Sequence, residues 1–552
     1  MKRIFSKAVS ILLAVIISVC GTIIANAEAK NSFDYLSYPD EAVTAFRPET
    51  LNRISSGDDY ISNRGYDETS LYFSPYWTLE IGGENVPVYA TAVYDFKLNR
   101  GVVQSFQYIY VDKDECSLDV TMKFSGKIKN ASALPESLGL KVKCSKNSLT
   151  SHIEKTGTYT FLINNDSQEY ALTLFIQRDR DEDAEIESFK KQYGEENVAV
   201  YKKGVYHLDS VPTDKDVIYF RRGSYICANH LADIRTAEDA QNHTSTPFME
   251  LNSKSGAVIT GCGTFDFTRI DRQERTLVNI NFCRNTMVEN LIILNPNSWT
   301  VTAYGSENCE LKSITVFGYR TNSDGINICG CGNMKISGCF CRNGDDCFSA
   351  KATNTEFECR DIEFTDCIGW SNKARCFGIT GEVERDIYNI SFKDCAVIYR
   401  NATWDNDRVA SLAVAVETGS GSVHDVTFEN IEIHRDAGRP IYCMVYGENI
   451  GGCEIDNITF RNVKYSAKGK IKISSERTIS KSGVFASAFV RFLKKLNMPK
   501  LFGKIIGALE EKYDTSNSVD VKFENVYSKN TRLKKLNQNR FCIVQGNSDV
   551  SF

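Results

Sequence analysis

Two short motifs contain three aspartates whose spacing could support acid–base chemistry. They are Asn322-Ser323-Asp324-Gly325 and Gly344-Asp345-Asp346-Cys347. Carboxyl groups held close together cannot all ionise freely, so at least one is expected to keep its proton near neutral pH. That proton can be donated to a leaving oxygen while an ionised neighbour activates water, as cleavage of a glycosidic bond requires. One such segment alone would more simply be a turn, but two of them favour a site.

The elements that must position these motifs form a degenerate repeat. Short alternating strands followed by Asn, Asp or Gly place equivalent apolar residues at Leu291, Ile314, Cys339, Cys367, Cys395, Ile431, Val463 and Val526. A unit of about 25 residues with insertions indicates a solenoid, because one unit cannot bury its own apolar face. The units contain several short strands and lack long helical periodicity, which predicts a parallel β-helix. The repeated cysteines then form an interior stack of thiols with no redox role.

This architecture places the two motifs on successive coils. Asp324 and Asp345 are separated by slightly less than one unit, so they should lie nearly above one another at a strand spacing of about 4.8 Å. Strand alternation would send Asp345 and Asp346 to opposite faces. We therefore expect a bend or bulge at Gly344 that points both into one open groove. A lateral displacement between Asp324 and Asp345 would bring their separation to roughly 6.5–9.5 Å, the range of inverting glycosidases.

The segments outside the repeat predict three further parts. Residues 28–75 read as an irregular leader, and period-two alternation from Tyr76 to about Gln177 predicts an antiparallel β-sandwich, so that residues 28–185 form the first domain. Arg178 to Glu185 reads as a solvated connector, and residues 186–552 form the solenoid domain. An insertion at about 473–518 predicts two amphipathic helices, which should pack on the solenoid. Contact with a membrane or cell envelope through residues 482–512 is the alternative.

Composition and the first residues bound the function class. Residues 1–27 resemble a secretory signal, with Lys2, Arg3 and Lys7 before an apolar stretch and Ala25-Asn26-Ala27 at its end. We expect a secreted monomer. The chain has 65 Lys and Arg and 70 Asp and Glu, and loss of the three signal cations leaves a net charge of −8. Such a balance offers no basic field for nucleic acid, and the six histidines show no metal-ligand spacing.

The two motifs resemble those of the inverting β-helix glycoside hydrolases, the clan of polygalacturonases and dextranases. The resemblance spans roughly Tyr201 to Val463 and also rests on Gly204-Val205-Tyr206, Gly263-Thr264-Phe265-Asp266 and the coil from Asn297 to Asn308. It implies a right-handed parallel β-helix fold and hydrolysis of a polysaccharide with inversion. It implies Asp345 as the general acid, Asp324 and Asp346 as the residues that activate water, and no metal or organic cofactor.

Other residues are candidates for holding the sugar or shaping the site. Lys351 could bind a sugar hydroxyl or be a solvated lysine, and Asn322 could orient Asp324 or only cap its turn. Four further side chains could line the cleft, although aromatic residues in a solenoid more often pack: Trp299, Tyr304, Arg375 and Tyr446.

Departures from the clan pattern bear on the substrate. Polygalacturonases carry a Gly-His-Gly segment where this chain has Cys376-Phe377-Gly378, and no equivalent of their Arg-Ile-Lys clamp is found near Arg439. With the N-terminal sandwich, this resembles the dextranase branch, glycoside hydrolase family 49, and slightly favours a dextran-like glucan. The alternatives are a polygalacturonase, a uronate lyase whose aspartates hold Ca²⁺, and a surface protein that binds glycans without catalysis.

Overall fold

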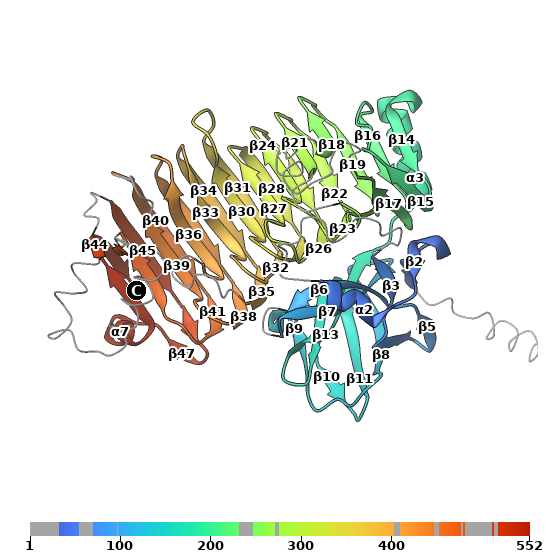
Figure 1. Ribbon diagram of the computed structural model, residues 1–552, viewed down its shortest axis with the longest axis horizontal. Coiled ribbons are helices and arrows are strands. Elements are labelled where there is room, and N and C mark those ends of the chain that lie inside the picture. The colour runs from blue at the N-terminus through green and yellow to red at the C-terminus, as the bar shows by residue number, and fades with distance from the viewer. Residues whose placement is uncertain are drawn as a thin grey trace, which may run out of the picture.

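The computed structural model describes residues 33–54, 70–95, 98–230, 247–270, 275–401, 409–445, 452–475, 478–480, 510–512 and 517–552. The expected signal segment lies outside these ranges. Two bodies are visible in Figure 1: a long stack of coils, and a smaller β-domain packed against its flank.

The stack is a parallel β-helix with three sheets, so the predicted fold class is confirmed. The first solenoid sheet has 12 strands: β14 (Val198–Tyr201), β16 (Val217–Phe220), β19 (Val258–Gly261), β22 (Met287–Glu289), β25 (Glu310–Lys312), β28 (Gly332–Ser337), β31 (Cys359–Thr365), β34 (Ile387–Lys393), β37 (Val423–Glu429), β40 (Glu454–Arg461), β45 (Ser518–Glu524) and β49 (Ser548–Ser551).

The second solenoid sheet also has 12 strands: β15 (Gly204–Leu208), β17 (Ser224–Ala228), β20 (Thr264–Asp266), β23 (Ile292–Leu294), β26 (Thr315–Phe317), β29 (Phe340–Asn343), β32 (Ile368–Ser371), β35 (Ala396–Arg400), β38 (Glu432–Asp436), β41 (Lys464–Ala467), β46 (Tyr527–Ser528) and β47 (Thr531–Arg532). The third has 10 strands: β18 (Pro247–Asn252), β21 (Thr276–Asn281), β24 (Val301–Tyr304), β27 (Ile326–Cys329), β30 (Phe348–Ala352), β33 (Phe377–Val383), β36 (Leu412–Thr418), β39 (Ile441–Val445), β42 (Ile471–Ser474) and β48 (Cys542–Gln545).

The repeat positions explain the coil geometry. All eight apolar repeat residues, from Leu291 to Val526, lie in one continuous core. The residue before each of them has a positive φ, and these residues are Asn290, Ser313, Gly338, Asp366, Asp394, Asn430, Asn462 and Asn525. Asn, Asp and Gly tolerate the left-handed conformation best. The turn before each apolar residue therefore explains why the repeat has Asn, Asp or Gly at most of these positions.

Rings and thiols fill the core in register. Phe392 and Phe428 stack at 4.8 Å between ring centroids, and Phe428 and Phe460 at the same distance, which matches the strand spacing. The 18 cysteines from Cys116 to Cys542 are free, and 16 of them are buried.

The N-terminal domain is a two-sheet sandwich. Its larger sheet contains β1 (Phe33–Tyr35), β2 (Val43–Thr44), β3 (Leu71–Phe73), β6 (Tyr89–Asp95), β7 (Arg100–Val111), β9 (Ala131–Leu134), β12 (Gly157–Ile163) and β13 (Ser167–Arg178). The smaller contains β4 (Trp77–Ile81), β5 (Glu84–Val86), β8 (Glu115–Phe124), β10 (Val142–Cys144) and β11 (Ser148–Lys155). Apolar residues from both sheets form a single core between them.

The expectation of a purely antiparallel sandwich is wrong for one pair of strands, because β7 pairs in parallel with β13. In the predicted leader, β2 and β3 also pair in parallel. Five strands separate β7 from β13 along the chain, so the connection is long enough to return the chain in the same direction. The alternation that predicted the strands carries no information about this direction.

The predicted leader and connector are more ordered than expected. The described leader residues include β1 to β3, a 3₁₀ turn η1 (Asp40–Ala42) and α2 (Pro48–Arg53). Residues 182–185 form the first turn of α3 (Glu182–Tyr193), where the Asp181 side chain accepts a hydrogen bond from the Ala184 amide. The acidic residues of the predicted connector therefore lie in the first turn of α3, where negative charge interacts favourably with the helix dipole.

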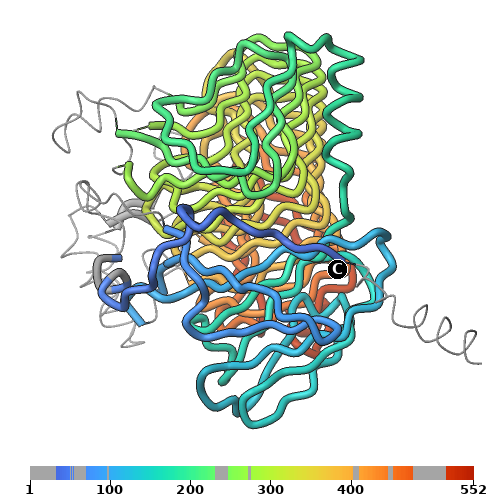
Figure 2. The backbone as a smooth tube through the Cα atoms, turned by 90° about the vertical axis from the view of Figure 1, so that its right-hand side faces the viewer, coloured from blue at the N-terminus to red at the C-terminus, as the bar shows by residue number. Residues whose placement is uncertain are grey.

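The larger sandwich sheet is buried on both faces because its outer face packs on the second solenoid sheet (Figure 2). Phe106 and Phe175 of the sandwich contact Phe317 of the solenoid, with ring centroids 4.9 and 6.3 Å apart. Side chains that point outward from this solenoid sheet thus belong to an interdomain core.

Most of the predicted helical insertion lies outside the described residues. The insertion is bracketed by β43 (Thr478–Ser480) and β44 (Glu510–Lys512), which pair antiparallel, so residues 510–512 are a strand where a helix was expected. The remaining short elements are η2 (Glu136–Leu138), η3 (Glu195–Asn197), η4 (Lys535–Asn537) and α7 (Gln538–Phe541). Among the described residues, no helix is long and apolar enough to cross a membrane.

Candidate active site

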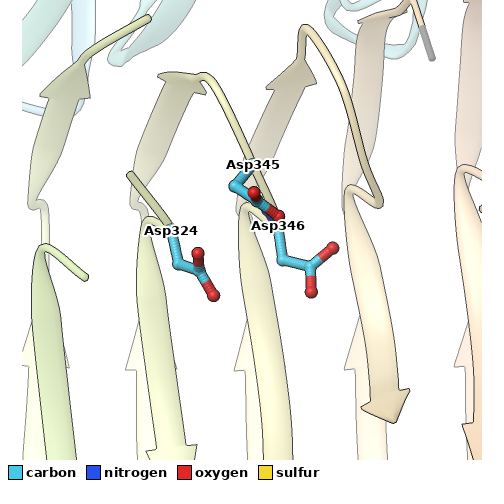
Figure 3. A group of neighbouring side chains, drawn as sticks. All are labelled: Asp324, Asp345 and Asp346. Atoms are coloured by element: carbon cyan, nitrogen blue, oxygen red, sulfur yellow. The ribbon is translucent and has the colours of Figure 1, made fainter. Parts of the chain in front are cut away.

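The three aspartates come together where the chain passes from the second to the third solenoid sheet (Figure 3). Asp324 lies in the loop between β26 and β27, and Asp345 and Asp346 lie in the equivalent loop of the next coil, between β29 and β30. One oxygen atom from each carboxyl group lies within 4.8 Å of the others. The predicted juxtaposition on successive coils is therefore present.

Each motif has a glycine that the packing requires. A Cβ atom at Gly344 would lie 2.0 Å from the Arg320 carbonyl oxygen, and one at Gly325 would lie 2.4 Å from the Cys347 carbonyl oxygen. The second contact joins the two loops directly. Only glycine permits such close approach of backbone segments, so these residues hold the aspartate loops together.

Backbone and side-chain hydrogen bonds fix the aspartates. Asp345 accepts hydrogen bonds from the Asn322 amide at 3.2 Å and from the Asp346 amide at 3.0 Å. Asp324 accepts one from the Asn327 side-chain amide at 3.2 Å. The Gly325 amide donates to the Asp346 carbonyl at 2.8 Å, which ties the two loops in the strand register.

Two basic side chains flank the aspartates, and each is also bound by a second carboxylate. Arg375 donates to both oxygens of Asp346, through its backbone amide at 3.0 Å and its guanidinium at 3.3 Å, and also pairs with Glu417. Lys351 Nζ lies 3.6 Å from Asp324 and 3.3 Å from Glu382. Among these seven groups, five carboxyls face two cations.

Burial and mutual repulsion perturb the carboxyl groups. Burial, followed by the charge of Asp346, raises the pKa of Asp345 to about 6. Burial and the charge of Asp345 raise the pKa of Asp324 well above its ordinary value, although the Lys351 ammonium opposes this rise. The cluster therefore holds at least one proton near pH 6, as expected for like charges at this distance.

The site differs from the predicted open groove. Asp324 and Asp346 are each only 3% exposed, and Asp345 alone is half-buried. The chain does bend at Gly344, but Asp345 and Asp346 lie in a loop and not in a strand. Strand alternation does not apply there, so no bulge is needed to bring the two carboxyl groups to one side.

The predicted separation of the carboxyl groups is also wrong for their nearest atoms. The oxygens within 4.8 Å are closer than the roughly 6.5–9.5 Å expected for an inverting pair. The expectation added a lateral displacement to the strand spacing, but the tie between Gly325 and Asp346 leaves the two loops almost in line.

The structure distributes the other candidate residues around the cluster. Asn322 has φ +62° and reaches Asp345 through its backbone amide. Lys351 Nζ lies 4.4 Å from the ring centroid of Trp299, which is half-buried. Tyr304 packs instead on Phe282, with ring centroids 5.4 Å apart. Tyr446 lies outside the described residues.

Sequence reasoning missed the residues that join the site from later coils. Glu382 and Glu417 lie in β33 and β36 and bind the two cations, and the Ser371 hydroxyl donates to the Asp345 carbonyl at 2.8 Å. None of them stands in a motif. Each is a single polar residue within or at the end of a strand, and many other residues of the sequence fit that description.

The same cluster is the one group of acidic residues, within the part of the chain that is described, that could hold a metal ion. Lys351 and Arg375, however, lie within 3.6 Å of Asp324 and Asp346. Calcium sites use six to eight oxygen ligands, and cations in ion-pair contact with two of three carboxylates compete with a divalent ion. The arrangement fits a metal poorly.

A comparison with family models decides what the site resembles. Residues 254–487 match the glycosyl hydrolases family 28 model. This family 28 segment contains both aspartate motifs and the whole of the cluster described above. The resemblance to β-helix glycoside hydrolases, and to a domain of the type that acts on O-glycosyl bonds, is therefore confirmed.

Two curated relatives match parts of the chain. A "Probable polygalacturonase" of Vitis vinifera is 32% identical over 83 residues, which are 15% of this chain and 17% of the relative. An "Alpha-L-rhamnosidase rgxB" of Aspergillus niger is 24% identical over 180 residues, 30% of this chain and 42% of the relative. The chain thus spans less than half the length of either relative.

Solved structures include a polygalacturonase from Erwinia carotovora ssp. carotovora, at 14% identity and a TM-score of 0.40, covering 66% of this chain and 93% of that one. The catalytic domain of a GH87 α-1,3-glucanase in complex with nigerose has 10% identity and a TM-score of 0.35, and covers 95% and 98% of the two chains.

Proposed function

We propose that the protein is a glycoside hydrolase that cleaves a neutral polysaccharide with inversion at the anomeric centre. The observation that carries the proposal is the cluster of Asp324, Asp345 and Asp346 inside a family 28 segment, where burial and mutual repulsion raise the pKa of Asp345 and of Asp324. A carboxyl group that keeps its proton can act as general acid, and its ionised neighbours can act as bases.

The exposure of the three carboxyl groups supports their roles. Asp345 is the most accessible, so it is the group that can protonate the leaving oxygen of a bound sugar. Asp324 and Asp346 lie behind it and are almost fully buried. Inversion is proposed from the resemblance to the inverting β-helix hydrolases. The nearest carboxyl oxygens, within 4.8 Å of one another, are closer than the roughly 6.5–9.5 Å usual for an inverting pair, so the configuration of the first product is the deciding measurement.

The charge of the site supports a neutral substrate. A uronate carboxylate needs a cation to bind it, and Lys351 and Arg375, which form ion pairs with Asp324 and Asp346, are already paired with Glu382 and Glu417. This chain also has Cys376-Phe377-Gly378 where polygalacturonases carry a Gly-His-Gly segment, which agrees with a neutral substrate. The relatives' names include both kinds of substrate, since galacturonate is charged and rhamnose is neutral. A dextran-like glucan is the first substrate to test.

A polysaccharide panel tests activity and substrate together. We expect reducing ends to appear with dextran or another neutral polysaccharide, with EDTA present, and the first product to have the inverted anomeric configuration by proton NMR. Hydrolysis of polygalacturonate alone would contradict the neutral substrate but keep the hydrolase. Retained configuration would contradict inversion, and an unsaturated product absorbing in the ultraviolet would indicate a lyase.

Glycan binding with no product across the panel would favour the non-catalytic alternative. Secretion belongs to the proposal too, on the strength of residues 1–27. Sequencing the N-terminus of the protein recovered outside its cells should find Glu28 first, and an intact Met1 in a cell-associated protein would contradict export.

A further inference from the structure

Two buried polar side chains lie directly behind the aspartates, one in each aspartate loop. Ser323 precedes Asp324, and Asn343 is the last residue of β29 and lies two residues before Asp345. Both side chains are fully buried. We call Ser323 and Asn343 the bridging pair, because each of them binds the loop that contains the other.

The hydrogen bonds of the bridging pair run in both directions between the loops. The Ser323 hydroxyl accepts a hydrogen bond from the Gly344 amide at 3.1 Å and donates one to the Arg320 carbonyl at 2.6 Å. The Asn343 side-chain amide donates to the carbonyls of Ser323 and Asp346, both at 2.8 Å. The backbone of one aspartate loop is therefore tied to that of the other by three side-chain bonds.

The asparagine is held in a single orientation. Its Oδ1 atom accepts a hydrogen bond from the Cys347 thiol at 3.0 Å, which leaves the two amide protons of Asn343 for the two carbonyls. A buried polar network in which every member is paired makes that part of the fold rigid. The bridging pair thus fixes the separation of the two loops and, with it, that of their carboxyl groups.

The separation of the loops bears on the acid. Burial raises the pKa of Asp345 to about 6, and the charge of Asp346 adds to the rise, whereas Lys351 and Arg375 oppose it. Burial is the largest cause, so loops that move apart and admit water should lower this pKa. The charged groups of the elements packed around Asp345 are Arg320 and Asp324 of the loop before β27, Asp346, Lys351 of β30, Lys373 and Arg375 of the loop before β33, Glu382 of β33 and Glu417 of β36.

We propose that Ser323 and Asn343 are positioning residues of the hydrolysis, which hold the three carboxyl groups in the arrangement that the reaction needs. The inference rests on the proposed hydrolase function and adds the residues that set the geometry of its acid and bases. The hydrogen bonds of both side chains go to backbone groups and to the Cys347 thiol. The bridging pair therefore acts on the carboxyl groups through the loops and not by direct contact with substrate.

A second buried serine makes the same kind of bonds away from the aspartates. Ser306 is 1% exposed, and its hydroxyl accepts a hydrogen bond from the Cys283 amide at 2.9 Å and donates one to the Ile280 carbonyl at 2.8 Å. It follows the end of β24, whereas Thr300, whose amide donates to the Asp324 carbonyl, precedes the start of that strand. Ser306→Ala is therefore the matched control for Ser323→Ala.

Kinetics of Ser323→Ala test the positioning role. With the polysaccharide hydrolysed in the panel, we expect kcat to fall about tenfold or more while KM stays within about twofold of the wild-type value. The alkaline limb of kcat/KM should move to lower pH by about half a unit or more, because water reaches Asp345. Ser306→Ala should lower the melting temperature by a similar amount and leave kcat and the pH profile unchanged.

Asn343→Ser removes the other half of the bridging pair and provides a second variant if Ser323→Ala does not fold. It should show the same fall in kcat at nearly constant KM and the same shift of the alkaline limb. Since both residues hold the same two loops, the double variant should lose less in log kcat than the sum of the two single losses.

Unchanged kcat and an unchanged alkaline limb in both variants of the bridging pair would overturn the positioning role and leave the hydrolase in place. Equal kinetic changes in Ser306→Ala, or loss of the fold in both variants of the pair, would do the same, because the side chains would then only stabilise the solenoid. A wild-type protein that hydrolyses no polysaccharide would overturn the proposed function, and the inference with it.

Discussion

At the scale of single residues, the raised pKa of Asp345 determines the expected pH dependence. A general acid must be protonated, so kcat/KM should fall about tenfold per pH unit above the pKa of the group, which burial and Asp346 raise to about 6. We expect Asp345→Asn to lower kcat by about 10²–10⁴ with little change in KM, and to remove this alkaline limb from the residual pH profile.

The control for that variant is Asp366→Asn. Asp366 occupies a left-handed corner of the solenoid, with φ +52°, where asparagine is equally suitable. Its activity and pH profile should match those of the wild type. If Asp345→Asn kept near-normal turnover, or kept a limb near pH 6, another group would be the acid.

The raised pKa of Asp345 also predicts that its ionised carboxylate lowers the free energy of unfolding. The folded-state pKa of Asp345 lies above the ordinary value of 3.8, so above about pH 6 the group is ionised in both states and the full penalty applies. Below about pH 4 it is protonated in both states and the penalty is gone. Each pKa unit corresponds to about 1.4 kcal/mol. Asp345→Asn should therefore raise the free energy of unfolding by up to about 3 kcal/mol at pH 8.

Unfolding by urea at pH 8 and pH 4 measures this difference. The gain of the variant over the wild type should be lost between pH 6 and pH 4. If the free energy of unfolding rose equally at both pH values, the increase would come from packing and not from removal of the charge.

The aspartates could be predicted from sequence because their chemistry and their spacing appear together in two short motifs. Glu382 and Glu417 could not, since each acts through a cation that is itself far away in sequence: Lys351 in one case, Arg375 in the other. A charge partner of this kind is selected by the stacking of coils. The exposure of Asp345 was equally beyond the sequence, because burial depends on what covers the face.

At the scale of elements, the motif glycines control how closely the two aspartate loops approach. A Cβ atom at Gly344 would meet the Arg320 and Tyr319 carbonyl oxygens at 2.0 and 2.6 Å, and neither backbone segment can move without moving the site. We expect Gly344→Ala to lower the free energy of unfolding by about 1–3 kcal/mol or more, as overpacking does, and to lower kcat because Asp345 is displaced. Chemical unfolding and kinetics with the panel substrate measure both effects.

Gly332→Ala is the matched control for Gly344→Ala. Its Cβ atom would meet only the end of the Arg360 side chain, at 3.2 Å, and that guanidinium can move aside. Both the stability and the activity of this variant should stay close to the wild-type values. Equal losses of stability and activity in the two variants would mean that any added methyl group is harmful in these coils. The close approach at Gly344 would then not be what positions the aspartate loops.

The solenoid was predictable because each coil repeats the same two demands, an inward apolar residue and a left-handed polar corner. The direction of strand pairing in the sandwich was not, since β7 and β13 satisfy the same alternation whether they run parallel or antiparallel. Tertiary contact decides there: both strands bury one face in the sandwich core and the other against the solenoid.

At the scale of the whole molecule, the sandwich reaches the aspartate loops through the interdomain core. Arg342, three residues before Asp345, is fully buried and lies 3.8 Å above the Trp370 ring, and Gln104 of the sandwich accepts a hydrogen bond from its guanidinium. The Trp370 indole donates to Gln168 of the sandwich at 2.9 Å. Both solenoid residues adjoin side chains that bind the aspartate loops, so the two domains are coupled at the site.

The last prediction concerns the hydrogen bond between Arg342 of the solenoid and Gln104 of the sandwich. Burial lowers the pKa of Arg342 to about 9, and its Nε and Nη2 have no partner among the described residues, so the cation is costly where it lies. Arg342→Met keeps the volume and removes the charge, which should leave stability unchanged or raise it. Gln104→Ala leaves the buried cation without its acceptor and should lower the free energy of unfolding by about 1–3 kcal/mol. In the Arg342→Met background, Gln104→Ala should cost much less. Urea unfolding of the two single variants and the double variant measures this coupling, and equal costs for Gln104→Ala in both backgrounds would show that Gln104 does not stabilise the fold through Arg342.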